Sequence, residues 1–525
     1  YNRQIQNLAR IVPEKWSFGG NDDNGILKGY LEHTFQRVYE EEKLLETEEY
    51  AIFNTGLFNM YYQYSYEKDY LSEFSGQGEA LDKLETGTDL AVLKTGDKSV
   101  YRYDQMGTHS YENSSMQTGT NGTSYYFSVA SGDITNFFNE VDLNTPWDYH
   151  YENLDSRTIL DRLAAVKYFV VKAGEEEYLP YGYDTLAAEA EKKDRLYRAY
   201  ECKNALPIGY TYDSYIPEKK YAKMSTVEKQ QALLQGVVLA DSAVPETTPE
   251  FNDREVPYKL VTGSGCKEKD GKLIITKENA QAKLVFDGLD ECETYLITEG
   301  VDYEALSPRE LISDKKWNKM TLYEQKKVQY ENSKWRYWKE SQKAYIDVTG
   351  QFLDKTISIF TDKYNAYSGR SDFLCNTGYS EKGKKSITLT FENTGVYSYK
   401  DMKVVCQPMK NIESQTSRLG TESLKDVKIK NHELTGSISV SKDKVLVISL
   451  PYSKGFQAYV DGQKTELKQA NTMYMALELT KGDHEIRITY YTPYLKTGLV
   501  LTCVGILCYI CVVLVCKKRR GNKET

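Results

Sequence analysis

Residues that could carry out chemistry are scattered along this chain of 525 residues. The five histidines lie far apart and lack the spacing of a metal site; they are His33, His109, His150, His432 and His484. The run Gly263–Gly265 is typical of a turn, because a phosphate-binding loop would follow a strand into a helix. Carboxylates are abundant, but a glycosidase pair is defined by its separation in space. The sequence therefore assigns no catalytic residue, no metal ligand and no cofactor within this chain.

One aromatic cluster is a candidate glycan-binding site. Trp335, Tyr337 and Trp338 fall close together in a charged stretch that we expect to be helical. Aromatic rings with a polar edge can stack on sugar rings or lie at a membrane interface. The cluster also suits the face with which a helical insertion docks onto its sheet, so both interpretations stay open.

Turn residues punctuate the last β-rich part of the chain. Asp461-Gly462 is typical of a type I′ hairpin, which needs positive φ at both positions. Lys481-Gly482-Asp483 predicts the next turn, and His484 is expected to serve packing or a turn. Five strands between residues 445 and 491 would form an antiparallel meander, one layer of a β-sandwich. The residues with this structural role are Gly455, Asp461, Gly462, Gly482 and His484.

A membrane helix is predicted near the C-terminus. Thr497–Cys516 contains twenty residues without a charge, enough to cross the ~30 Å hydrocarbon core. A basic cluster follows, which indicates a cytoplasmic tail and an extracytoplasmic bulk; it consists of Lys517, Lys518, Arg519 and Arg520. A buried core helix is the alternative. The expected partner is the lipid bilayer, in the cell membrane.

The start of the chain raises a second topological question. Tyr1 opens a sequence whose first forty residues contain no apolar signal-peptide segment. We expect the chain to be the C-terminal part of a longer protein with upstream membrane helices. The alternative is a tail-anchored protein with its bulk in the cytoplasm.

Composition limits the class of partner. The chain carries 67 basic and 76 acidic residues, a net charge of -9, which argues against a nucleic-acid binder. It contains 45 tyrosines against 16 phenylalanines. Tyr packs with one side of its ring and hydrogen-bonds at the other end, which suits exposed β-surfaces and sugar-contacting platforms. A secreted β-rich protein would also use Tyr on half-buried strands.

Capping signals locate several helices. Asp155 or Ser156 is expected to cap a helix that precedes a buried strand, Val166–Val171. Ser225 with Glu228 predicts a capping box. Two further signals predict a helical insertion within a β-structure, and they are Ser307-Pro308-Arg309-Glu310 and Thr321 with Glu324.

These elements predict a mainly β member of the α+β class with several domains. The mixed α/β N-terminal region comprises a polar, partly helical part, 1–98, and a domain, 99–240. An acidic, proline-containing linker, 241–257, follows. A β-sandwich, 258–410, carries the helical insertion, 301–344. The meander, 411–496, leads into the membrane helix, 497–516, and the basic tail, 517–525.

Three blocks of sequence resemble the YfhO family of bacterial membrane proteins. The longest, SLPYSKGFQAYVDGQKTELKQANTMYMALELTKGDHEIRITYYTPYLKTG, combines a Lys-Gly-aromatic turn, a Val-Asp-Gly hairpin and a Gly-x-His-x-Ile strand before the final membrane helix. The others are DSRTILDRLAAVKYFVV, from Asp155, and NALPIGYTYD, from Asn204. Together the blocks are spread over residues of about 100 to 516, and they are fairly specific as a set.

The resemblance implies a function for the whole protein. The family is similar to multi-spanning glycosyltransferases that use a lipid-linked sugar donor, and it has been linked to decorating teichoic-acid-type cell-wall polymers. The catalytic acid of such enzymes lies on an early extracytoplasmic loop that this chain lacks, so no catalytic residue is carried over. The chain would then bind or position an acceptor cell-wall polymer, and whether it is itself an enzyme stays open. The alternative is a membrane-anchored structural or adhesive β-sandwich protein; an anchored glycoside hydrolase is a third possibility.

Overall fold

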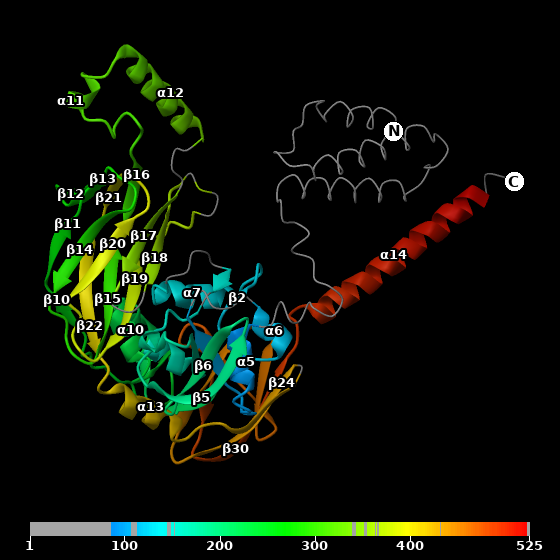
Figure 1. Cartoon of the computed structure of the whole chain (residues 1–525). Helices are drawn as coiled ribbons and strands as arrows, with labels where there is room; N and C mark the ends of the chain where they lie inside the picture. The colour runs from blue at the N-terminus through cyan, green and yellow to red at the C-terminus, as the bar shows by residue number, and fades with distance from the viewer. Residues whose placement is uncertain are drawn as a thin grey trace. The chain divides into compact units, whose positions relative to one another are not determined.

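The computed structural model describes residues 86–106, 113–143, 149–151, 153–338, 343–350, 354–362, 364, 367–430 and 432–521. Most of the predicted region 1–98 lies outside these residues. The described part consists mainly of antiparallel strands with a smaller share of helix, which confirms the mainly β, α+β class. Figure 1 shows three β-rich bodies and one long C-terminal helix.

The first body is built on a four-stranded sheet in the order β1-β4-β6-β5. Strand β4 confirms the predicted buried strand, and its residues alternate between two cores. Tyr168 and Val170 pack with helix α5, whereas Phe169 and Val171 belong to the central core. The elements of this body are α5 (Gly87–Leu93), β1 (Arg102–Gln105), α6 (Ser114–Thr118), β2 (Tyr125–Tyr126), α7 (Gly132–Glu140), β3 (His150–Tyr151), α8 (Thr158–Leu163), β4 (Val166–Lys172), η2 (Glu176–Tyr178), β5 (Tyr183–Lys192), β6 (Arg195–Cys202), β7 (Gly209–Tyr212), β8 (Tyr215–Pro217), α9 (Glu218–Tyr221), α10 (Thr226–Ala232) and β9 (Val237–Leu239).

The second body is a large sandwich of three sheets, ordered β10-β22-β15-β19, β11-β14-β20-β17-β18 and β12-β13-β21-β16. Its elements are β10 (Arg254–Val256), β11 (Tyr258–Thr262), β12 (Cys266–Lys269), β13 (Lys272–Ile275), β14 (Ala280–Phe286), β15 (Cys292–Glu299), β16 (Asp302–Ala305), α11 (Asp314–Trp317), α12 (Leu322–Trp338), β17 (Lys343–Thr349), β18 (Asp354–Phe360), β19 (Phe373–Ser380), β20 (Ser386–Phe391), β21 (Gly395–Ser398) and β22 (Asp401–Pro408).

The two chain ends of this large sandwich lie side by side. Its first strand, β10, pairs antiparallel with its last strand, β22, so that Arg254 is opposite Cys406. The chain therefore enters and leaves the sandwich at one place. The stretch 241–257, which we expected to be a linker, lies beside α10 and contains β10 near its end. There the Gln235 side chain exchanges two hydrogen bonds with the backbone of Glu250, and the Gln231 side chain accepts one from the Asn252 N–H.

The third body is a sandwich of two sheets, ordered β23-β24-β30-β26-β27 and β28-β29-β25-β7. Its elements are α13 (Ile412–Gly420), β23 (Lys425–Lys430), β24 (Glu433–Val440), β25 (Lys444–Pro451), β26 (Phe456–Val460), β27 (Gln463–Thr465), β28 (Lys468–Ala470), β29 (Tyr474–Leu479) and β30 (Gly482–Tyr490). The single-meander prediction is wrong, because β25 and β29 form one sheet with β7, whereas β26 and β30 belong to the other.

Strand β25 explains why the first and third bodies are joined. Leu446 and Ile448 point into the core of the third body, whereas Val445 and Val447 belong to the core of the first. A strand buried on both faces carries a continuous apolar run, here VLVISL. On its far edge β25 pairs with β7, with Val445 opposite Tyr212. One sheet is thus shared across the predicted boundary at 241–257.

The local turn and cap signals had mixed outcomes. Asp461 and Gly462 both have positive φ and join β26 to β27, as a type I′ hairpin requires. The capping box of Ser225 with Glu228 is formed. Asp155 and Ser156 do not cap α8; both have positive φ, and the N-cap position, Arg157, makes no capping hydrogen bond.

The C-terminal helix α14 (Leu495–Gly521) follows β30 after four residues. Its segment Leu495–Leu514 has a mean hydropathy of 2.5 and is not buried against the rest of the protein. Among the described residues it is the one helix long and apolar enough to cross a membrane, by length and composition. The backbone of α14 continues through the basic cluster at 517–520.

Candidate functional site

A groove of about 1090 Å³ opens between the helical insertion and the end of the large sandwich. Figure 1 shows α11 and α12 projecting from the end of the sandwich at which β16 lies. One wall comes from β16, the turn after it and α12. The other comes from the end of β18 and the segment 367–371.

The insertion wall is held by a chain of local contacts. The carboxylate of Glu310 accepts hydrogen bonds from the backbone N–H (2.8 Å) and the hydroxyl (2.6 Å) of Ser307, which closes a turn in place of the helix predicted there. The Arg309 guanidinium stacks 4.3 Å from the centre of the Trp317 ring. The backbone N–H of Arg309 donates to Asn332 of α12, at 3.2 Å. This bond ties the turn to the helix.

Helix α12 presents its groove-lining residues one turn apart. The predicted capping box is present at its start, where the Glu324 N–H donates to the hydroxyl of Thr321 (3.3 Å) and its carboxylate accepts from the Thr321 N–H (2.7 Å). Asn332 and Trp335 are three residues apart, so they share one helix face. Both line the groove, and the Trp335 side chain is half-buried there.

The opposite wall combines an aromatic and a cationic side chain. Tyr367 is 50% exposed, so its ring is open to contact from the groove. The guanidinium of Arg370 lies 5.0 Å from the centre of the Phe373 ring, and its Nε donates to the Asp372 carbonyl at 3.2 Å. Between them Gly369 adopts φ +76°, a left-handed conformation that favours glycine.

The groove floor belongs to the sandwich itself. On β16 Asp302 and Glu304 are exposed, while Tyr303 between them points into the core, as expected from strand alternation. The lining therefore brings together aromatic rings, carboxylates and two guanidinium groups. Rings can cover the apolar face of a sugar, and carboxylates and guanidinium groups can bind neighbouring hydroxyls in pairs.

The structure places one of the three predicted aromatic residues in the groove. Trp335 is a lining residue, whereas the side chains of Tyr337 and Trp338, at the end of α12, lie outside the described residues. The sequence did not identify Tyr367 and Arg370 as further groove residues. They follow the hairpin of β17 and β18 along the chain, whereas Trp335 precedes it. Among the described residues, no group of three or more His, Cys, Asp or Glu side chains could hold a metal ion.

The predicted turn residues lie elsewhere, at the third body. Nδ1 of His484 is 2.8 Å from a carboxylate oxygen of Asp461, and its Nε2 is 2.7 Å from the carbonyl oxygen of Thr480. The ring thus joins the two predicted turns. Burial lowers the pKa of His484, but the hydrogen bonds to Asp461 and Thr480 and the charges of Asp461 and Asp483 together outweigh it, so the pKa is raised. A Cβ at Gly455 would come within 2.5 Å of the Tyr491 carbonyl, so only glycine fits that turn.

A second polar cluster, which sequence reasoning missed, surrounds α8. Every residue from 153 to 166 is buried, although the segment contains four charged side chains. We call this cluster the polar junction, since it lies where the first body meets the large sandwich. Its members are Asp155, Arg157, Thr158, Asp161, Arg162, Gln230, Glu293, Tyr295, Lys355 and Glu413.

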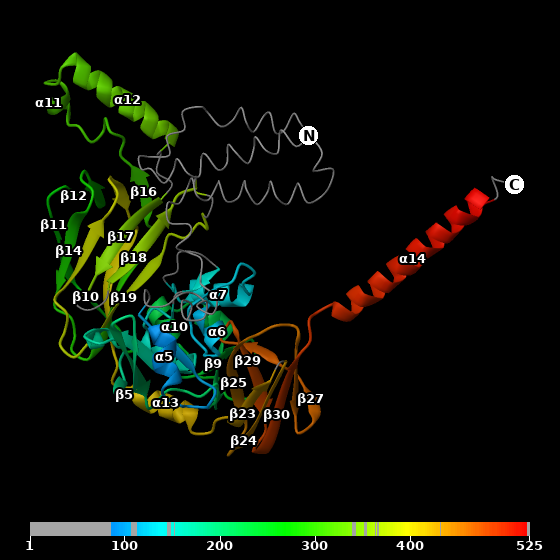
Figure 2. The same ribbon diagram turned by 45° about the vertical axis from the view of Figure 1, so that its right-hand side comes forward.

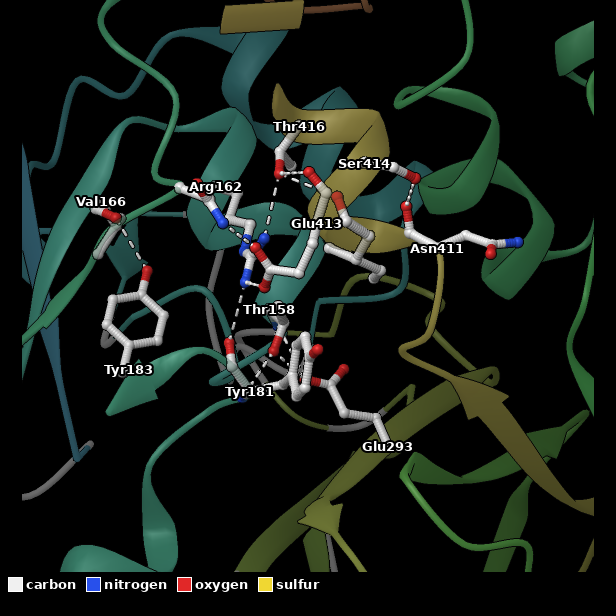
Figure 3. Close-up of polar contacts among 12 residues, drawn as sticks. Thr158, Arg162, Val166, Tyr181, Tyr183, Glu293, Asn411, Glu413, Ser414 and Thr416 are labelled. Atoms are coloured by element: carbon white, nitrogen blue, oxygen red, sulfur yellow. Dashed lines mark hydrogen bonds and ion pairs between the residues drawn. The ribbon is translucent and has the colours of Figure 1, made fainter. Parts of the chain in front are cut away.

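A carboxylate from the sandwich takes the place of the missing helix cap. Glu293 of β15 accepts hydrogen bonds from the Thr158 N–H (3.0 Å) and from the Thr158 hydroxyl (Figure 3). The Tyr295 hydroxyl donates to Glu293 at 2.5 Å and accepts from Gln230, which in turn accepts from Arg157 at 3.0 Å. Burial raises the pKa of Glu293.

The far end of α8 is fixed by an ion pair to the third body. Figure 3 shows Arg162 between Glu413 of α13 and the backbone of Tyr181. The Arg162–Glu413 distance is 2.6 Å, and Thr416 accepts a further bond from the guanidinium at 3.1 Å. Burial raises the pKa of Glu413, but the hydrogen bonds from Arg162 and Asn204 and the charge of Arg162 together lower it by more, so the carboxylate is held in its charged form.

Comparisons with known proteins identify a family. The family model described as "Bacterial membrane protein YfhO" matches residues 44–502. A model for a domain of unknown function, DUF3825, matches residues 8–70, which lie outside the described part of the chain.

The relatives found are distant. The "Uncharacterized protein YfhO" of Bacillus subtilis (strain 168) is 22% identical over 475 residues, which cover 87% of this chain and 47% of that protein. The chain thus spans about half the length of this curated relative. A cryo-EM structure of the arabinofuranosyltransferase AftD from mycobacteria is 14% identical, covers 31% of this chain and 13% of that one, and has a TM-score of 0.13, too low to support an argument. Because the YfhO model matches most of the sequence, including the groove and the polar junction, this chain belongs to the YfhO family of bacterial membrane proteins.

Proposed function

We propose that the groove between α12 and the large sandwich binds a glycan acceptor for a membrane glycosyltransferase. The observation that carries this proposal is the groove itself, an open cavity of about 1090 Å³ in which Trp335 and Tyr367 come from opposite walls. A hollow with apolar rings and a few placed polar groups is typical of a ligand site.

The charges around the groove add selectivity. Asp302 and Glu304 would accept hydrogen bonds from sugar hydroxyls, and Arg370 would bind a phosphate group. The guanidinium of Arg309 is already paired with Asp314 and with the Ile312 carbonyl, each at 2.9 Å. The guanidinium group of Arg309 stacks on the Trp317 ring and that of Arg370 on the Phe373 ring, and these contacts hold both groups in place. Four carboxyl groups line the groove against two guanidinium groups, so the lining favours a hydroxyl-rich polymer over one with a dense negative charge.

The transfer reaction belongs to the proposal for the whole protein. This chain spans 47% of its curated relative, and the catalytic residues and the lipid-linked sugar donor are expected in the other part. The bulk of the chain would be extracytoplasmic and the tail after α14 cytoplasmic, as the basic residues at 517–520 favour. The groove would then present acceptor polymer to the membrane-embedded part.

The test is binding by the full chain in nanodiscs to an array of cell-wall polymers that includes teichoic acids. We expect retention of at least one hydroxyl-rich polymer, and a tenfold or greater loss with Trp335→Ala or Tyr367→Ala. Tyr323→Ala is the matched control, because Tyr323 is on the same insertion, is 78% exposed and does not line the groove.

Two outcomes would overturn the proposal. The first is an absence of binding to every polymer on the array, and the second is equal loss in the groove variants and in Tyr323→Ala. Binding without any transfer by the whole protein would favour the alternative, an adhesive β-sandwich protein held by one anchor.

A further inference from the structure

A stretch of twenty residues in the first body has no charged side chain. It runs from 113 to 132, in a chain of which 27% of the residues are charged. Within and beside it five large apolar side chains are exposed: Met116 (78%), Tyr126 (47%), Phe127 (56%), Val129 (79%) and Tyr149 (38%). We call these five residues the apolar tip.

The backbone beneath the apolar tip is held by hydrogen bonds. Asn113 exchanges two of them with Tyr126, at 2.9 and 3.2 Å. The Phe127 N–H donates to the Tyr149 carbonyl at 3.0 Å, and the rings of Tyr126 and Tyr149 pack edge to face at 5.5 Å. The apolar side chains are therefore displayed by an ordered scaffold. Such a patch on a protein surface marks a contact with another phase or molecule.

Contacts place the apolar tip at one end of the shared sheet. Helix α7 follows the tip directly, and its Phe137 ring lies 6.1 Å from Tyr474, at the start of β29. Glu140 at the end of α7 accepts a hydrogen bond from Thr472, in the turn before β29. Figure 2 shows α6 and α7 next to β29 and β25.

The chain enters its membrane helix from that same end. Tyr474 pairs with Pro451 at the end of β25. The turn after Pro451 receives a hydrogen bond from Tyr491, whose N–H donates to the Gly455 carbonyl at 2.9 Å. Tyr491 immediately follows β30, and α14 begins four residues later. Tyr491 and Tyr494 are 53% and 83% exposed, as aromatic side chains at a membrane interface are.

We propose that the apolar tip inserts into the interface of the bilayer that α14 crosses. A membrane interface accepts Tyr, Phe, Met and Val side chains together with uncharged hydroxyls and amides. The tip would act with α14 as a second membrane contact, which fixes the tilt of the first body above the bilayer. This inference does not depend on the glycan proposal.

The experiment uses the full chain in nanodiscs prepared with or without lipids brominated on the acyl chain. Phe127→Trp and Val129→Trp each place a fluorescent reporter at the tip, and the unmodified chain gives the background from its five native tryptophans. The matched control is Leu186→Trp, because Leu186 is 47% exposed on β5, an edge strand of the same body.

We expect the added fluorescence at position 127 or 129 to fall at least twofold in brominated nanodiscs, and that at position 186 to stay unchanged. Equal fluorescence with and without bromine at both tip positions would overturn the proposal. That result would point to a protein surface as the occupant of the tip. Quenching at position 186 as strong as at the tip would overturn it too, since the contact would then be unspecific.

Discussion

Asp161 and Arg162 are adjacent in α8 and are both fully buried, but their surroundings favour a neutral acid and a charged base, respectively. Arg162 has a carboxylate partner, Glu413, in another body. Asp161 instead lies near a second buried carboxyl group, Asp104; burial and this neighbour raise the pKa of Asp161 well above its usual range. We therefore expect one cation and one proton-bearing acid in the same helical turn.

The first prediction concerns Asp161→Asn. A carboxyl group whose pKa is higher in the folded state costs stability once the unfolded chain ionises, so stability falls as the pH rises above about 4 toward the folded pKa. Asparagine resembles the protonated acid and removes this dependence. We expect a flatter profile of urea midpoints between about pH 4 and 8, with the variant more stable at the upper end. Parallel profiles for the two proteins would contradict a buried, protonated Asp161.

Glu413→Gln should have the opposite pH signature. Because the pKa of Glu413 is lowered in the folded state, its contribution is present above the unfolded value of about 4.3 and is lost as the pH falls through the folded value. Glu413 is partly exposed, so we expect a loss of about 1–2 kcal/mol in the free energy of unfolding at neutral pH.

The control for Glu413→Gln is Glu189→Gln. Glu189 pairs with Arg198 at 2.7 Å, but this pair lies on the surface. We expect a change below about 0.5 kcal/mol. The free energy of unfolding is measured with urea at neutral pH. Equal losses in the two variants would show that the burial of Arg162 gives its ion pair with Glu413 no extra stability.

At the scale of elements, hairpins depend on single backbone conformations. Gly462 has φ +76°, and a Cβ built there would meet nothing within 4 Å. Gly462→Ala therefore tests conformation alone, and we expect it to cost about 1 kcal/mol. Gly132→Ala is the control, because that site is equally open, lies in α7 and has no positive φ; it should be neutral or stabilising. Equal thermal midpoints for the two variants would contradict the prediction.

Local signals predicted some elements correctly, but not the cap at Asp155 or Ser156 or the helix at Ser307–Glu310, and elements specified by distant partners were missed. The Asp461-Gly462 hairpin and the box of Ser225 with Glu228 need only local residues, and both are formed. The meander failed because the partner of β25 on one edge is β7, from a distant segment of the chain. No local pattern distinguishes VLVISL as a strand shared by two cores from a strand in one sandwich.

In the candidate site, too, the sequence identified only the residue that has a local signal. Trp335 could be picked out because it belongs to a dense aromatic cluster. Tyr367 and Arg370, across the groove, have no such signal. The polar junction was missed for a different reason: Asp155, Arg157 and Asp161 occupy a short segment that resembles an exposed amphipathic helix, and only the packing of β15 against it shows that they are buried.

At the scale of the whole molecule, membrane topology decides on which side of the bilayer each surface lies. We expect Lys464→Cys, on the exposed hairpin strand β27, to react with a membrane-impermeant maleimide in intact cells. Thr525→Cys, in the basic tail, should react only after the cells are permeabilised. Labelling of full-length chain is read by mass spectrometry. The reverse pattern would place the bulk of the protein in the cytoplasm.

The pairing of β10 with β22 has a consequence for modularity. Because Arg254 and Cys406 are opposite each other, the large sandwich begins and ends at one point of the assembly, like a domain inserted into a host. The host, made of the first and third bodies, closes its own sheet through β7 and β25. Relatives could therefore exchange the whole sandwich, groove included, while keeping the frame made by the first and third bodies. Glu293, Tyr295, Asn376 and Lys355 are among the residues that any exchanged sandwich would have to keep, since they bond to the buried segment at the start of α8 or to its partner Gln230.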